Sequence, residues 1–66
     1  MIAYRLLTGP DDSSFCHKVT EALAKGWSLH GSPAYAPGPD GAPRCAQAVT
    51  KEVAGEYDPD RKLGSL

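Results

Sequence analysis

The first residues of the chain alternate between two faces, and the segment that follows them has a helical period. Residues 2–7 show the alternation of a β-strand, and residues 14–25 place apolar side chains at every fourth position. The pattern therefore predicts a strand followed by one amphipathic helix. The strand carries Ile2, Tyr4 and Leu6 on one face and Ala3, Arg5 and Leu7 on the other, and the helical stripe consists of Phe15, Val19 and Leu23, flanked by Cys16 and Ala22.

Both ends of the predicted helix carry sequence signals. Asp11 and Asp12 precede the first turn, where carboxylates accept hydrogen bonds from free N–H groups and favour the positive end of the helix dipole. Gly26 follows the last turn and can adopt the left-handed conformation that closes a helix. We expect Trp27 to pack back on that turn as a core anchor, a role that we prefer to ligand stacking.

Two more strands are predicted after the helix. The period returns to two from Trp27 to Tyr35, but Gly31 and Pro33 weaken the run. This strand should therefore be an edge strand, or should end or bulge near Ser32-Pro33. Residues 36–43 contain three prolines and two glycines, which is typical of an exposed hairpin connection. The third strand, residues 44–53, carries Cys45, Gln47 and Val49 on one face and Arg44, Ala46, Ala48 and Thr50 on the other.

These elements predict an α+β fold in which one helix packs on a three-stranded antiparallel sheet, in the chain order β-α-β-β. Because a helical crossover joins strands one and two and a hairpin joins strands two and three, the simplest sheet order is 1-3-2. A sheet with strand one beside strand two is the alternative. We expect residues 1–53 to form a single domain and residues 54–66 to form a C-terminal tail. The predicted core consists of Tyr4, Leu6, Phe15, Val19, Leu23, Trp27, Leu29 and Val49.

Length and composition restrict the class of protein. A chain of 66 residues buries only about 60% of the surface that its unfolded form exposes. The stability that a single core provides is then marginal, and such domains usually need a disulfide, a metal or a partner subunit as well. Two cysteines are too few for a disulfide scaffold, and no secretory segment or long apolar run is present. We therefore expect a cytoplasmic protein that gains its additional stability from self-association.

The charge balance argues against non-specific binding to nucleic acid or anionic membranes. Seven Lys and Arg residues face eight Asp and Glu residues, which gives a formal net charge of -1. A protein that binds nucleic acid or anionic membranes without sequence specificity normally carries a basic footprint. Nucleic-acid and membrane binding are therefore disfavoured.

The residues that could carry chemistry are few. Tetrahedral zinc could use Cys16, His17, His30 and Cys45, but the chain has no Cys-x2-Cys pair, and we prefer inert thiols and surface histidines. We expect no cofactor, no metal and no catalytic residue.

Two nucleophilic or acid–base hypotheses are also weaker than their structural alternatives. Cys16 and His17 are adjacent, so their side chains point about 100 degrees apart on a helix, which favours a core thiol over a catalytic pair. Asp11 and Asp12 lack the lysine and the glycine spacing of a phosphate-binding loop, so helix capping explains them better than magnesium or acid–base chemistry.

Three stretches of the sequence resemble the family called domain of unknown function 1737: YRLLTGPDDSSFCHKVTEALAKGW, the following GSP step and CAQAVTKEV. The resemblance covers about residues 3–53 and implies a small bacterial or phage-borne domain with no assigned activity. This chain departs from the family pattern in its Pro/Gly-rich hairpin and at Ser28, where we expect a larger polar residue such as Glu. The resemblance rests on Thr8-Gly9-Pro10-Asp11, Phe15-Cys16-His17, Gly26-Trp27-Ser28-Leu29 and Cys45 with Gln47-Ala48-Val49.

One helix can cover only one face of the predicted sheet, so the other face is left to water or to a partner. We expect a non-enzymatic interaction module that forms a homo-oligomer through the uncovered sheet face or an edge strand, with an unknown protein as a further candidate partner. The expected interface consists of Arg5, Leu7, His30, Ser32, Ala46 and Ala48. The alternative is a ligand-, anion- or nucleic-acid-binding domain that uses Arg5, His30, Arg44 and Tyr35, and a small enzyme or zinc site built on Cys16, His17, His30 and Cys45 ranks below both.

Overall fold

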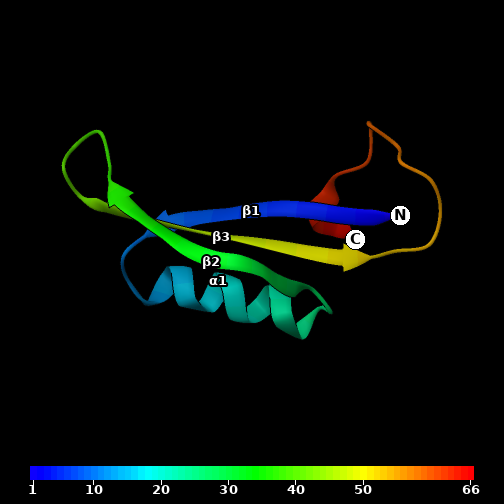
Figure 1. Ribbon diagram of the computed structural model, residues 1–66, viewed down its shortest axis with the longest axis horizontal. Coiled ribbons are helices and arrows are strands. Elements are labelled where there is room, and N and C mark those ends of the chain that lie inside the picture. The colour runs from blue at the N-terminus through cyan, green and yellow to red at the C-terminus, as the bar shows by residue number, and fades with distance from the viewer.

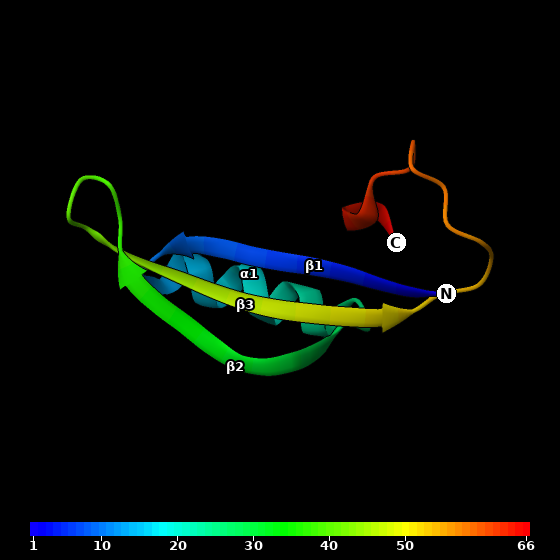
Figure 2. The same cartoon turned by 45° about the horizontal axis from the view of Figure 1, so that its top comes forward.

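The computed structural model describes residues 1–66 and has one helix on one side of a three-stranded antiparallel sheet (Figure 1). The predicted α+β class, the β-α-β-β order and the sheet order β1-β3-β2 are confirmed. Figure 2 shows β3 between the other two strands. The elements are β1 Ile2–Pro10, α1 Ser13–Ala24, β2 Ser28–Pro37, β3 Pro43–Glu52 and the short 3-10 helix η1 Leu63–Ser65.

The two strand pairs differ in regularity. The β1–β3 ladder runs without interruption from the Ile2–Glu52 pair to the Pro10–Arg44 pair. The β2–β3 ladder shifts register between His30 and Ala34, where Gly31 has a φ of 71 degrees. Pro33 lies in this irregular stretch and cannot donate to a ladder. The predicted edge strand with a bulge is therefore confirmed, and all ten residues of β2 are exposed.

The N-terminus of α1 is capped by one of the two predicted aspartates. The Asp12 carboxylate accepts hydrogen bonds from the backbone N–H and the hydroxyl of Ser14, and these bonds lower the pKa of Asp12 below its usual value. The prediction that Asp11 also caps the helix is wrong. Its carboxylate instead accepts a hydrogen bond of 2.8 Å from the Tyr35 hydroxyl on β2, because Asp11 lies outside the first turn and faces the sheet.

The C-terminus of α1 ends in a Schellman motif. Gly26, with a φ of 95 degrees, donates to the carbonyl of Leu23, and Trp27 donates to the carbonyl of Ala22. Only a residue that accepts the left-handed conformation closes a helix in this way without strain. The motif turns the Trp27 side chain back under the last helical turn, as the sequence predicted.

The core is small and centres on Trp27. Five hydrophobic residues are buried, and Trp27 is 3% exposed. The Arg5 guanidinium and the Lys51 ammonium lie over the indole ring at 5.3 and 5.9 Å from its centroid, a cation–π geometry that also shields the ring from water. The buried hydrophobic residues are Ala3, Leu7, Ala22, Trp27 and Val49, with Phe15, Val19, Val53, Leu63 and Leu66 partly buried around them.

The structure reverses the predicted orientation of β1. Leu7 pairs with Gln47 and is 4% exposed, so it faces α1, whereas Leu6 is 56% exposed on the opposite side. The reason is steric. Gly9 faces α1, where a Cβ would come within 3.1 Å of Phe15, and the period of two then turns Leu7, Arg5 and Ala3 to the same side.

Half of the predicted core residues are therefore exposed. Tyr4 and Leu6 are 52% and 56% exposed because they share the face of β1 that α1 does not cover. Leu23 is 42% exposed because Ala22, not Leu23, meets the indole ring at the end of the helix. Leu29 is on the helix side of β2 but is 53% exposed, since α1 lies nearer β1 than β2.

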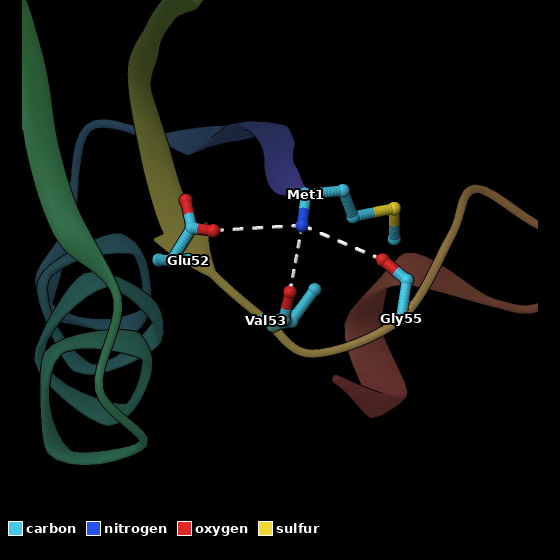
Figure 3. Close-up of polar contacts among 4 residues, drawn as sticks. All are labelled: Met1, Glu52, Val53 and Gly55. Carbon is cyan, nitrogen blue, oxygen red and sulfur yellow. Dashed lines mark hydrogen bonds and ion pairs between the residues drawn. The ribbon is translucent and has the colours of Figure 1, made fainter.

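The tail after β3 returns to the helix side of the sheet. Leu63 and Leu66 pack against the core, and the Lys51 ammonium donates to the main-chain oxygens of Leu66 and Lys25 at 2.6 and 2.8 Å. At the start of the tail, the Met1 ammonium donates to Val53 O at 2.8 Å (Figure 3). The division of the chain at residue 53 stays a prediction. With its twelve residues, α1 is too short and too polar to cross a membrane, and the chain has no other α-helix.

The reversed β1 is tested by a pair of adjacent substitutions. Leu7→Ala should lower the free energy of unfolding by about 2–4 kcal/mol, because it leaves a cavity in the core between β1 and α1. Leu6→Ala should cost less than about 1 kcal/mol in a dilute sample, because its side chain is already largely exposed. Urea unfolding of both variants measures the difference, and a larger loss from Leu6→Ala would contradict the orientation described above.

The helix cap gives a prediction about pH. Asp12→Ala should lower the melting temperature by several degrees at pH 7, because the first turn loses its acceptor. Since the pKa of Asp12 is lower in the folded state, the charge-dependent stabilisation is present above the unfolded pKa of about 4 and is lost as pH falls through the folded value. Thermal melts should therefore show a smaller gap from wild type in acid. Asp12→Asn is the control, since it keeps the acceptor without the charge.

Candidate interaction surface

The sheet side opposite α1, which we call the open face, gathers three large exposed apolar side chains on one strand. No helix covers it (Figures 1 and 2), and the register assigns its residues without ambiguity, because directly paired residues share a face. The open face consists of Ile2, Tyr4, Leu6 and Thr8 of β1, Arg44, Ala46, Ala48, Thr50 and Glu52 of β3, and Ser28, His30, Ala34 and Ala36 of β2.

Large and small side chains are separated on the open face. Ile2, Tyr4 and Leu6 form an apolar ridge along the β1 edge and are 70%, 52% and 56% exposed. The central strand presents only small side chains between Arg44 and Glu52, and Ala48 lies directly beside Leu6 in the ladder. The surface of another protein can therefore approach the centre of the sheet closely and contact the ridge.

A shallow hollow occupies the hairpin end of the same face. Its volume is about 250 Å³. The β2–β3 hairpin loop bends to the side of the sheet opposite α1 and borders this end (Figure 1), and the Arg44 side chain packs against Gly38 in that loop. The hollow is lined by Thr8, Ala34, Tyr35, Ala36, Arg44, Cys45 and Ala46.

Only part of the predicted interface lies on the open face. His30, Ala46 and Ala48 are there, as expected. The assignment of Arg5 and Leu7 to this surface is wrong, because both face α1, and Leu7 is buried. Ser32 is exposed in the irregular stretch of β2 between His30 and Ala34. Tyr4 and Leu6, predicted as core, belong to the interface side instead.

The sequence pattern divided the residues of β1 correctly between two faces, but the face with Tyr4 and Leu6 was assigned to the core. The ridge was missed for that reason. A signal was available at Gly9. A glycine two residues after Leu7 marks the position where the strand passes closest to the helix, and parity then assigns Leu7 and Arg5 to the helix side.

The four soft metal ligands do not converge on one site. Cys16 is exposed on α1, His30 lies on the open face and Cys45 faces the helix side at the hairpin end. No three His, Cys, Asp or Glu side chains stand close enough together to hold a metal ion. Desolvation raises the pKa of the Cys45 thiol, which keeps it protonated and weakly nucleophilic at neutral pH.

The predicted anion-binding set is also divided between the two sides of the sheet. Arg5 faces α1, whereas His30 and Arg44 lie on the open face. Tyr35 is on the helix side and donates its hydroxyl proton to Asp11, a bond that raises the pKa of Tyr35. These four residues therefore do not form one site.

A polar groove that sequence reasoning did not find runs beside α1. Its volume is about 660 Å³. Arg5 lines the groove, and its guanidinium lies over the Trp27 ring. Lys25 pairs with Glu21 at 2.8 Å, and the Lys18 ammonium donates to the carbonyl of Thr8. The groove is lined by Arg5, Ser14, His17, Lys18, Glu21, Ala22, Lys25 and Gly64.

Comparison with known proteins adds one finding. The family described as "Domain of unknown function (DUF1737)" matches residues 1–52, which include β1, α1, β2 and β3. No curated protein and no solved structure matches the chain. The open face, the helix cap and the Trp27 anchor all lie inside the matched residues. Because the family model matches most of the 66 residues, the chain belongs to the DUF1737 family.

Proposed function

We propose that this protein is a non-enzymatic interaction module that self-associates through the open face of its sheet. The observation that carries the proposal is the apolar ridge of Ile2, Tyr4 and Leu6, which is more than half exposed beside a central strand of small residues. An exposed apolar patch of this kind is typical of a protein–protein contact.

The small core gives a reason for association. Only 7 of 66 residues are buried, and a domain of this size gains little stability from one side of a sheet. Packing the open face against a second copy would bury the ridge and give the sheet its second covered side. Self-association thus supplies the stabilisation that disulfides or a metal give to other small domains.

The size of the face sets the expected affinity. Three strands spaced about 4.8 Å apart and about 30 Å long give a total buried surface on the order of 1,000 Å² for two copies. Interfaces of that size are at the weak end of specific association. We therefore expect a dissociation constant in the micromolar range, with a dimer that forms as the protein is concentrated.

The dispersed nucleophiles support a non-enzymatic role. Cys45 has a raised pKa, and Cys16 stands on the exposed surface of α1, away from His30. Catalysis needs titratable groups that converge on a concave site and activate the nucleophile, whereas the raised pKa of Cys45 disfavours its thiolate. Both cysteines are free thiols, which is consistent with the reducing cytoplasm that we propose as the compartment.

The groove beside α1 supports a second candidate function, the binding of a small polyanion. Arg5 forms neither of the two ion pairs in the molecule, yet its guanidinium is held in place over Trp27 at 5.3 Å. A preorganised guanidinium near Lys18 is suited to phosphate oxygens. The groove has a single hydrophobic lining residue, Ala22, so a ligand without an aromatic base fits it best.

Self-association is tested by placing a charge on the ridge. Leu6→Glu should raise the dimer dissociation constant at least about tenfold, because the charge would be buried between two copies. Leu23→Glu is the matched control, since Leu23 is 42% exposed on α1 and outside the open face. Sedimentation equilibrium from 5 to about 500 micromolar measures both. A wild type that stays monomeric throughout, or equal effects of the two variants, would remove the proposal.

The polyanion site is tested with tripolyphosphate. Calorimetric titration should detect binding that weakens with added salt, and Arg5→Gln should reduce the affinity about tenfold. Arg44→Gln, on the other side of the sheet, should leave the affinity unchanged. Lys18→Gln provides a second variant that does not touch Trp27. Equal binding by wild type, Arg5→Gln and Lys18→Gln would exclude this groove.

A further inference from the structure

We infer that two copies pack open face to open face with their β3 strands antiparallel, so that Arg44 of each copy lies opposite Glu52 of the partner subunit. This inference rests on the self-association proposed above and adds the orientation of the partner. Ala48 lies at the centre of the contact, where its small side chain lets the two central strands approach each other.

Symmetry limits the choice of orientation. Two identical faces that pack on each other are related by a two-fold axis that lies in the plane between the sheets. With the axis parallel to the strands, β3 would run parallel to its copy and each residue would meet the same residue near the axis. With the axis across the strands, β3 would run antiparallel to its copy, and the two ends of the face would exchange places.

The charges of β3 favour the antiparallel orientation. Arg44 and Glu52 are both exposed on the open face, each four residues from Ala48, which corresponds to about 13 Å along the strand. Equal spacing about Ala48 means that a two-fold axis at that residue brings unlike charges together at both ends. The parallel orientation would instead place Arg44 near Arg44 and Glu52 near Glu52, which is repulsive.

The shape of the hairpin favours the same orientation. The β2–β3 loop bends to the open-face side of the sheet (Figure 1). In a parallel arrangement the loops of the two copies would meet at the same end and hold the sheets apart. In the antiparallel arrangement each loop lies over the opposite end of the partner, beyond Glu52. The apolar ridges then also meet each other, with Leu6 beside Leu6 of the partner subunit.

The charge pairs select the orientation and do not supply the affinity. Exposed ion pairs change an equilibrium constant by only a few-fold each, so the ridge provides most of the binding. The dimer contains two equivalent Arg44–Glu52 contacts. Reversing one charge in the sequence therefore converts two attractions into two repulsions, and the combined effect should be about tenfold in the dissociation constant.

The experiment uses the full chain with two charge reversals and their combination. Arg44→Glu alone and Glu52→Arg alone should each weaken the dimer about tenfold at low salt, and the double variant should return to wild-type affinity. Lys62→Glu and Asp58→Arg, both in the tail, change net charge equally and are the controls. Far-UV circular dichroism checks folding. Glu52→Arg removes only the 3.5 Å contact with Met1, whose ammonium still donates to Val53.

Mixing wild type with the double variant separates the remaining outcomes. In the antiparallel orientation the mixed dimer brings like charges together, so wild type and double variant should each prefer their own kind. In the parallel orientation the mixed dimer is favoured, and single reversals have little effect, which would overturn the inference while keeping self-association. A wild type that never dimerises would instead refute the proposed function itself. Native mass spectrometry of the mixture counts the three dimers directly.

Discussion

The packing of the Trp27 ring is the interaction on which the other elements depend. The ring is buried against Ala3, Ala22 and Val49, so it joins the helix to both β1 and β3 at one point. The Schellman motif at Gly26 turns the chain so that the Trp27 side chain points into this core. A ring of this size explains why the positions on β1 and α1 that face it are alanines, since a larger residue would compete for the same space.

The two cations over the indole ring extend this core toward the tail. Lys51 contacts the Trp27 ring and also donates to the main chain at Lys25 and Leu66. It therefore links β3, the end of α1 and the returning tail through one side chain. Leu63 and Leu66 complete the cover on the helix side. These apolar contacts of the tail thus lie on the helix side of the sheet.

The result is a sheet with unequal sides. One side holds the indole ring, the helix and the tail, whereas the other carries the exposed ridge of Ile2, Tyr4 and Leu6. Antiparallel sheets tolerate one wet side, but here that side carries three large exposed apolar side chains along β1, beside the small and polar residues of β3 and β2. The proposed self-association follows from that inequality and from the small core, and the charges at the two ends of β3 then select the orientation of the partner.

The sequence by itself determined the local structure. The periods of two and four defined the strands and the helix, and Gly26 and Asp12 marked the ends of that helix. Chain connectivity favoured the order β1-β3-β2 without excluding β1 beside β2, and the structure confirms it. These features depend on neighbours within a few residues or on how short connections can run. The family resemblance covers the same residues and supported the same local structure, but it implied no activity.

Only the tertiary structure decided which side of β1 the helix covers. A period of two states that Leu6 and Leu7 face opposite ways, but both are leucines, so hydrophobicity cannot rank them. The choice depends on the close approach of Gly9 to Phe15 and on the register with β3, which are contacts between distant segments. Asp11 shows the same limit, because its partner Tyr35 is 24 residues away. Side-chain period follows from the backbone, whereas the covered side follows from packing.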